Sequence, residues 1–200
     1  IGDGAFQDCR RLRSVTIPNG VTKISNYAFV NCFSLVSVSI PKGVTEIGNM
    51  AFFNCRSLTS VNIPEEVTKI GPCAFEGCRS LTSVNIPEGV TQVEKRTFTD
   101  CINLASVMIP DSVTLIEECA FSYCSGLTSV TIPKGVTEIG EGAFYECRGL
   151  TSILIPKNMI NIGDIAFCLC ALDDIYVHKS TKIHPDALHS NYKVRVIRYT

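Results

Sequence analysis

Apolar and polar positions recur along this chain with a fixed period of 23 residues. Phenylalanine holds one position of the period eight times, at Phe6, Phe29, Phe52, Phe75, Phe98, Phe121, Phe144 and Phe167. Cysteine holds another eight times, at Cys9, Cys32, Cys55, Cys78, Cys101, Cys124, Cys147 and Cys170. A period of this length is typical of solenoids, whose units bury their apolar sides against their neighbours. The pattern therefore predicts a stack of coils, and it favours an extended recognition surface over a catalytic pocket.

The first part of the period, L-x-S-V-x-I-P-x-G, has the pattern of a strand followed by a corner. In residues 58–63 we expect Leu58, Val61 and Ile63 to face inward and Asn62 to face outward. Pro64 cannot continue a central ladder, because it has no N–H. A second short extended piece, V-T-x-I, is expected after the corner, as in residues 67–70.

The remainder of the period, A-F-x-x-C-x-x-L, changes its spacing. Ala51, Cys55 and Leu58 stand at i, i+4 and i+7, which is the spacing of one helical face. This spacing predicts one or two helical turns on the side of the coil opposite the main strand.

The strand motif L-x-x-V-x-I is similar to the leucine-rich-repeat signature, with proline in place of the usual Asn or Cys after the strand. The phrase LTSVTIPKGVTEIGEGAFYEC, residues 127–147, resembles the BspA-like, or Treponema-type, leucine-rich repeats. The resemblance covers residues 1–172, and it implies surface display, adhesion to host or matrix proteins, or other protein binding. The expected fold is an α/β solenoid, a leucine-rich-repeat-like right-handed superhelix of 23-residue coils with a parallel sheet of short strands.

The phase of the repeat breaks after Cys170. We expect residues 1–172 to form about seven to eight repeats, beginning in mid-repeat, as in a fragment that lacks its N-terminal portion. Residues 173–200 are interpreted as a divergent last repeat and a C-terminal cap that shields the apolar end of the stack. A junction into a following domain is the alternative.

Composition and charge exclude several classes of protein. Hydrophobic residues make up 46% of the chain and charged residues 18%, which is not the composition of a disordered segment. The formal net charge is −1 and no block of like charge occurs, so neither nucleic acid nor a membrane surface is an expected partner. No apolar run is long enough for a membrane-spanning helix.

The eleven cysteines do not have the spacing of a zinc site. The eight at the 23-residue period are expected to be small buried hydrophobes with inert thiols. Disulfides between cysteines of adjacent coils are geometrically conceivable and stay open as an alternative.

The three histidines, His178, His184 and His189, all lie in the divergent C-terminal segment with Asp186 nearby. Their spacing matches no known ligand motif, and the repeats contain no histidine that could serve a nucleophile. We therefore expect no catalytic residue, no metal, no cofactor, no small-molecule substrate and no enzymatic activity.

Two surfaces of the stack could contact a partner. The outward strand positions are short and polar, but they change to Met108, Leu154 and Tyr176 toward the C-terminus. The variable turns beside the Ala-Phe motif carry the candidate partner-binding ridge: Tyr27, Phe33, Met50, Phe53, Arg56, Arg79, Tyr123, Tyr145 and Arg148. Aromatic residues and arginine are favoured hot-spot types, although these rings could instead pack over the coil edge.

Two functions from different classes follow from these features. The first is a non-enzymatic protein-binding module of a cell-surface or secreted protein that adheres to a host protein or an extracellular-matrix macromolecule. The second is a cytoplasmic scaffold, or the targeting region of a larger protein whose catalytic domain lies outside this sequence. Unpaired thiols in every coil favour a reducing or anaerobic setting.

Overall fold

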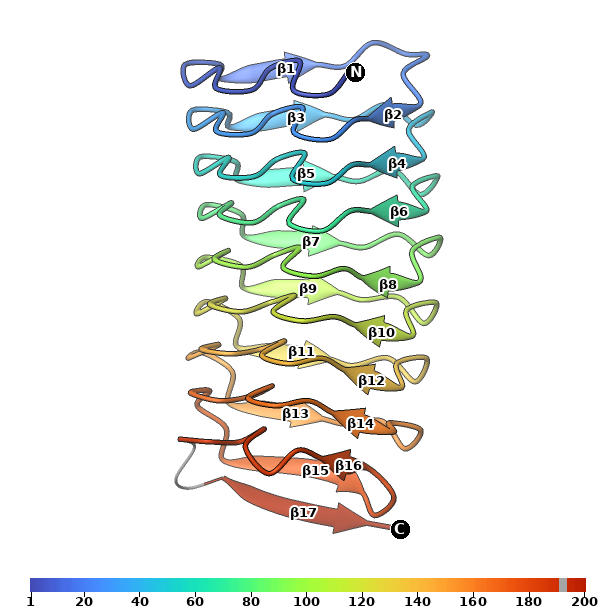
Figure 1. Ribbon diagram of the computed structural model, residues 1–200, viewed down its shortest axis with the longest axis vertical. Coiled ribbons are helices and arrows are strands. Elements are labelled where there is room, and N and C mark those ends of the chain that lie inside the picture. The colour runs from blue at the N-terminus through green and yellow to red at the C-terminus, as the bar shows by residue number, and fades with distance from the viewer. Residues whose placement is uncertain (191–193) are drawn as a thin grey trace.

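A computed structural model describes residues 1–190 and 194–200, and it shows an elongated stack of coils (Figure 1). Each coil carries a main strand on one side of the stack and, after a corner, a two-residue strand. The main strands are β1 (Ser14–Thr16), β3 (Ser37–Ser39), β5 (Ser60–Asn62), β7 (Ser83–Asn85), β9 (Ser106–Met108), β11 (Ser129–Thr131), β13 (Ser152–Leu154), β15 (Asp174–His178) and β17 (Arg195–Tyr199). The short strands are β2 (Lys23–Ile24), β4 (Glu46–Ile47), β6 (Lys69–Ile70), β8 (Gln92–Val93), β10 (Leu115–Ile116), β12 (Glu138–Ile139), β14 (Asn161–Ile162) and β16 (Lys182–Ile183).

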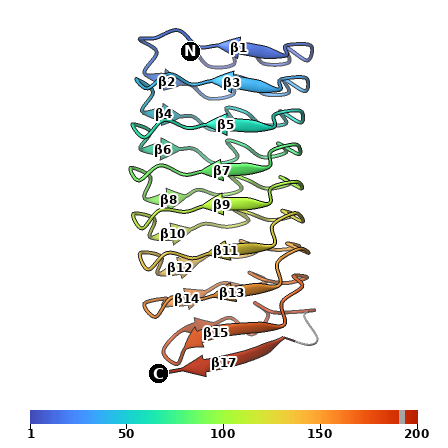
Figure 2. The same cartoon turned by 180° about the vertical axis from the view of Figure 1, so that it is seen from behind.

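Neighbouring coils are stacked in register, as the repeat predicts. Val38 of β3 is aligned with Val15 of β1 and with Val61 of β5, and these strand pairs are parallel. The turned view shows the main strands one above another from β1 to β17 (Figure 2). Equivalent residues of successive coils therefore form continuous columns, each perpendicular to the strands.

The core consists of such columns. Phenylalanine rings from Phe6 to Phe167 stack with centroids 5.1–5.5 Å apart and interplanar angles between 1° and 11°. Each of these rings from Phe29 onward is fully buried. A ring therefore lies against the ring of the neighbouring coil, and no coil could bury its own phenylalanine without that neighbour.

The predicted strand and corner are confirmed. Leu58, Val61 and Ile63 are buried and Asn62 is exposed, so side chains alternate between the core and solvent. The N–H of Val67 donates to the carbonyl of Pro64 at 3.0 Å and closes the corner. The same bond follows the other strand-ending prolines, as between Val44 and Pro41.

The predicted helical turn is wrong, because no segment of residues 1–190 or 194–200 is helical. In residues 27–32 the N–H groups of Tyr27 and Phe29 donate to carbonyls of the next coil, those of Asn49 and Ala51, at 2.9 and 2.8 Å. The N–H of Cys32 closes a tight turn on the carbonyl of Phe29 at 3.2 Å. Hydrogen bonds between coils thus take the place of the i→i+4 bonds of a helix. The fold is a parallel β-solenoid without the α component that the spacing suggested.

Backbone dihedral angles give the local reason. Two positions in each coil from Gly4 to Leu169 have positive φ, namely the residue before the Ala (or Thr97) of the Ala-Phe motif and the residue before the column cysteine. Thirteen of them are not glycine: Asp8, Tyr27, Asn31, Met50, Asn54, Cys73, Arg96, Asp100, Cys119, Tyr123, Glu146, Ile165 and Leu169. A residue in the left-handed region interrupts a right-handed helix, so these two positions turn the segment into consecutive tight turns.

The column cysteines are free thiols, and all of them except Cys9 make the same kind of hydrogen bond to the preceding coil. The thiol of Cys55 donates to the carbonyl of Phe29 in the preceding coil at 3.2 Å, and that of Cys78 to the carbonyl of Phe52 at 3.3 Å. The same contact recurs from Cys32 to Cys170. The expectation of buried thiols is confirmed for these seven residues and is wrong for Cys9, which is exposed.

Native thiol labelling should separate three classes of cysteine. Eight thiols are buried, Cys73 and Cys119 are half-buried, and Cys9 is exposed. Burial raises the pKa of Cys73 to about 11, and burial also raises the pKa of Cys119, so little reactive thiolate forms at neutral pH. With iodoacetamide and mass spectrometry we expect Cys9 to label first, then Cys73 and Cys119, and the rest only in denaturant. Labelling of the buried thiols at the rate of Cys9 would contradict this assignment.

The last coils depart from the 23-residue spacing of the repeat. Ser152 of β13 is aligned with Asp174 of β15, and Asp174 in turn with Arg195 of β17, so the spacing falls from 23 residues to 22 and then 21. β15 and β17 are longer than the earlier main strands, with five residues each. Arg195 forms a two-point ion pair with Asp174 at 2.7 and 2.9 Å.

The described part of the chain contains no helix long and apolar enough to cross a membrane.

Candidate functional site

The N-terminal part of the candidate ridge is organised around Phe33. This half-buried ring lies between Arg10 and Arg56, whose Cζ atoms are 5.4 and 4.8 Å from the ring centroid. The three residues follow successive column cysteines, so the stacking of coils brings them together. Both guanidinium groups therefore make cation–π contacts within the chain itself. Of the other residues in this part, Tyr27 is exposed, and Met50 and Phe53 are half-buried.

The C-terminal part of the ridge contains two tyrosines in edge-to-face contact. Tyr123 and Tyr145 have ring centroids 5.4 Å apart and planes at 82°. Tyr123 is 44% exposed, whereas Tyr145 is half-buried. Arg148, three residues after Tyr145, pairs with Glu146 at 2.7 Å. This pair of rings offers an amphipathic surface of the kind that protein interfaces favour.

Arg79 lies between the two parts, and its guanidinium is engaged with the neighbouring coil. Its Nε and Nη2 atoms both donate to Oδ2 of Asp100, at 2.9 and 2.7 Å. The structure thus places the nine predicted residues along the same turns of the stack, with partners within the chain for Phe33, Arg56, Arg79, Tyr123, Tyr145 and Arg148.

The opposite surface, formed by the main strands, carries a second candidate. Met108 is 67% exposed, Leu154 64% and Tyr176 43%. Leu154 is aligned directly with Tyr176 on one side and with Thr131 on the other. We call Met108, Leu154 and Tyr176 the apolar strand column. The same position holds Ser39, Asn62 and Asn85 in the N-terminal coils, where the surface is polar.

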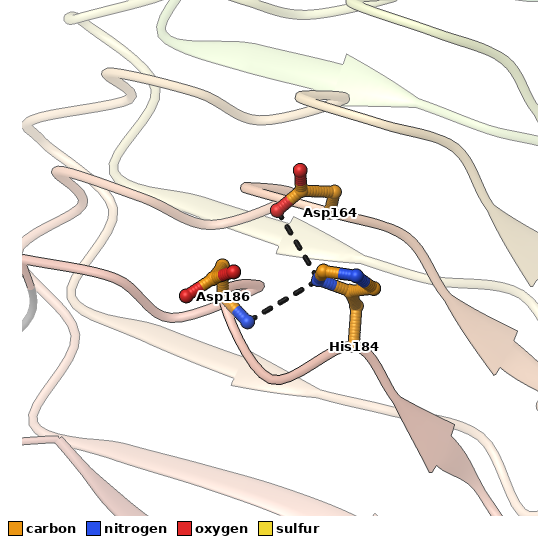
Figure 3. A group of neighbouring side chains, drawn as sticks. All are labelled: Asp164, His184 and Asp186. Carbon is orange, nitrogen blue, oxygen red and sulfur yellow. Dashed lines mark hydrogen bonds and ion pairs between the residues drawn. The ribbon is translucent and has the colours of Figure 1, made fainter.

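A third group, which sequence spacing did not indicate, lies where the regular frame ends (Figure 3). One ligand atom each of Asp164, His184 and Asp186 lies within 4.8 Å of the others. His184 and Asp186 are neighbours in the sequence, but Asp164 stands twenty positions before His184 and comes close to them only through the stacking of coils. An alignment of the coils in register, with Ile162 beside Ile183, would have revealed this proximity.

Parallel strands stacked in register, with phenylalanine repeated in one core column and cysteine in another, define a solenoid repeat protein. The model of the BspA type leucine rich repeat region matches residues 1–128 and 116–198. The chain therefore belongs to this family of BspA-type leucine-rich repeats.

Three solved structures similar to this chain are also described as leucine-rich proteins. A leucine-rich repeat protein from Bacteroides ovatus is 28% identical over 100% of this chain and 58% of its own, with a TM-score of 0.87. A leucine rich cell surface protein from Faecalibacterium prausnitzii is 28% identical over 100% of this chain and 82% of its own, with a TM-score of 0.60. The T. pallidum leucine rich repeat protein is 28% identical over 93% of this chain and 91% of its own, with a TM-score of 0.62.

The chain thus spans 58% of the length of the Bacteroides ovatus protein. A search of the curated proteins finds no match. The family and these structures indicate no catalytic class, and they are consistent with a repeat module that binds proteins.

Proposed function

We propose that this chain is a non-enzymatic protein-binding module of a cell-surface or secreted protein, and that it adheres to a host or matrix macromolecule. Membership of the BspA-type family supports protein binding. Surface location is supported by the similar protein from Faecalibacterium prausnitzii, which is described as a leucine rich cell surface protein.

The apolar strand column is the observation that carries this proposal. The fold does not require large apolar side chains at these positions, because Ser39, Asn62 and Thr131 occupy the same column. Exposed apolar residues gathered on one surface are typical of contact sites. Leu154 and Tyr176 are adjacent exposed residues of β13 and β15, and Met108 is exposed at the same position of β9. Figure 2 shows where these three strands lie in the stack.

The candidate ridge is the second contact surface in this proposal. Tyr27 and Tyr123 are exposed, and tyrosine is a frequent anchor in interfaces. Phe33 and Arg79, in contrast, already have partners in neighbouring coils. We therefore rank the apolar strand column above the ridge.

A cytoplasmic scaffold or targeting region of a larger protein is the alternative function. The eleven free cysteines favour it, because free thiols are typical of reducing compartments. The full-length gene separates the two functions: a secretion signal with a surface anchor supports adhesion, and an attached catalytic domain supports targeting.

We also propose that residues 173–200 act as a cap on the stack. The longer strands β15 and β17 and the Arg195–Asp174 pair supply polar groups at the end of the main sheet. The hydroxyl of Tyr199 donates to the carbonyl of Ile155 at 3.0 Å and ties the last strand to an earlier coil. Such polar end units shield the apolar face of a solenoid.

Binding to immobilised matrix proteins tests the contact surface. In a biolayer-interferometry panel of purified fibronectin, laminin and collagen, we expect saturable binding to at least one protein. The combined substitutions Met108→Thr, Leu154→Thr and Tyr176→Thr should weaken it about tenfold or more, since they remove the apolar contacts. The melting temperature should change little, because Thr131 already occupies this column.

Matched controls decide which surface binds. Ser39→Thr, Asn62→Thr and Asn85→Thr alter the same column in the N-terminal coils and should leave affinity unchanged. Phe53→Ser, Tyr123→Ser and Tyr145→Ser test the ridge in the same way. If only the ridge variant loses binding, the candidate ridge, and not the apolar strand column, is the contact surface. Absence of binding to every protein of the panel would contradict the adhesion proposal.

A further inference from the structure

The group of Asp164, His184 and Asp186 lies between the last regular coil and the divergent coil that follows it (Figure 3). Asp164 follows the short strand β14, and His184 follows the next short strand, β16. Oδ1 of Asp164 is 3.2 Å from Nδ1 of His184. Both side chains are a little under half exposed, so the group is open to solvent on one side.

Oδ1 of Asp164 is buried and has no hydrogen-bond partner. In the equivalent position of the first coils, Oδ1 of Asp3 accepts the N–H of Asn26 at 3.0 Å, and Oδ1 of Asn26 accepts the N–H of Asn49 at 2.9 Å. The equivalent residue after Asp164 is Pro185, which has no N–H to donate. The repeat thus brings a carboxylate oxygen to a place where its usual donor has been removed.

Nδ1 of His184 is the nearest candidate donor to this oxygen, and the two would form an ion pair with a protonated imidazole. When the imidazole is neutral and its Nδ1 atom accepts the backbone N–H of Asp186 at 3.2 Å, this nitrogen carries a lone pair and no proton. Two acceptor atoms, Nδ1 of His184 and Oδ1 of Asp164, therefore face each other at 3.2 Å. Such a pair repels unless a positive charge lies between them.

We propose that Asp164, His184 and Asp186 bind one divalent transition-metal ion, of which Zn²⁺ is the representative. Imidazole nitrogen and carboxylate oxygen are ligands that zinc prefers, with bonds of about 2.0–2.2 Å. Two ligands at that distance from one ion lie roughly 3.0–3.5 Å apart in octahedral or tetrahedral geometry. The observed separation of 3.2 Å falls in this interval.

The third ligand comes from Asp186, which lies two residues after His184 and within 4.8 Å of the other two ligand atoms. Its side chain is exposed, so a rotamer change brings its carboxylate to the ion without disturbing the core. His189 lies 3.9 Å from Asp186 and offers a further imidazole. Solvent fills the remaining positions, and the bound ion joins the coil of β14 to that of β16.

Isothermal titration with ZnCl₂ at pH 7.5 and thermal melting with and without Zn²⁺ test the site. We expect one ion per chain, micromolar affinity and a higher melting temperature, since an ion that binds the folded chain stabilises it. Asp164→Asn and His184→Gln should each weaken binding by about tenfold or more.

Three controls keep the result specific. His178→Gln removes a histidine that contacts Ser180 and lies outside the group, so it should leave affinity unchanged. Substituting the accessible thiols, Cys9→Ser, Cys73→Ser and Cys119→Ser, should also leave it unchanged. Pro185→Ala keeps every ligand but restores an N–H that can donate to Asp164, so it should weaken binding several-fold.

The proposal fails if no saturable binding occurs, or if Asp164→Asn and His184→Gln bind Zn²⁺ as the unmodified chain does. It also fails if the serine substitutions abolish binding, because the thiols would then be the ligands. Histidine NMR signals that report a protonated His184 paired with Asp164, unchanged by Zn²⁺, would likewise overturn it. None of these outcomes depends on whether the chain binds matrix proteins.

Discussion

Phe75→Ala is expected to lower the free energy of unfolding by roughly 3–5 kcal/mol, because it removes a fully buried ring and leaves a cavity. Phe75 has no exposed surface and stacks on Phe52 and Phe98 at 5.3 and 5.5 Å. The loss therefore affects two inter-coil contacts, and in a solenoid these contacts hold neighbouring coils together. Urea unfolding followed by circular dichroism measures the difference.

Phe6→Ala is the matched control for this prediction. Phe6 is half-buried and stacks on Phe29 alone among the rings of the column, at 5.1 Å. Its removal should cost much less, since this ring is only half-buried and one ring contact is lost instead of two. Phe75→Leu, which keeps most of the apolar volume, should lie between the two. If Phe6→Ala and Phe75→Ala lower the free energy of unfolding equally, the stacked phenylalanine rings are not what stabilises the central coils.

Cys73→Pro is expected to destabilise the chain by about 3 kcal/mol or more. Cys73 has a φ of 56°, which proline cannot adopt, and its N–H donates to the carbonyl of Lys95 in the next coil at 2.9 Å. If residues 73–78 began a helix, proline would instead be tolerated at its first position. Urea unfolding of this variant therefore distinguishes consecutive tight turns from the helical turn that the spacing suggested.

Cys73→Gly is the companion substitution, and it should raise stability by about 1 kcal/mol. Glycine adopts positive φ without strain, and the equivalent position is already glycine at Gly4 and Gly142. The same denaturation experiment measures it. A stabilising proline or a strongly destabilising glycine at residue 73 would show that this backbone conformation is not the native one.

The candidate sites differ in how far sequence reasoning could reach them. Met108, Leu154 and Tyr176 are recognised from sequence because they break a polar column at a known position of the period. The contact of Tyr123 with Tyr145, and that of Phe33 with Arg10 and Arg56, required the distances between coils. Asp164 escaped notice because ligand motifs are read along the chain, whereas its neighbour His184 belongs to the next coil.

The 23-residue period by itself determined the stack, the parallel register and the identity of the core columns. The physical reason is that a coil of this size cannot bury Phe52, Cys55 or Leu58 alone, so identical coils must cover one another. The strand and the corner could also be predicted from the sequence, because the alternation of apolar and polar residues and the missing N–H of proline act on the local backbone.

The tertiary structure alone decided the conformation of the Ala-Phe segment. Helical spacing and tight-turn spacing place the same side chains inward, so periodicity does not separate them. Hydrogen bonds from residues such as Phe29 to the next coil replace those of a helix, and such bonds exist only after stacking. For the same reason, only the stacked chain shows which oxygen lacks a donor, as Oδ1 of Asp164 does beside Pro185.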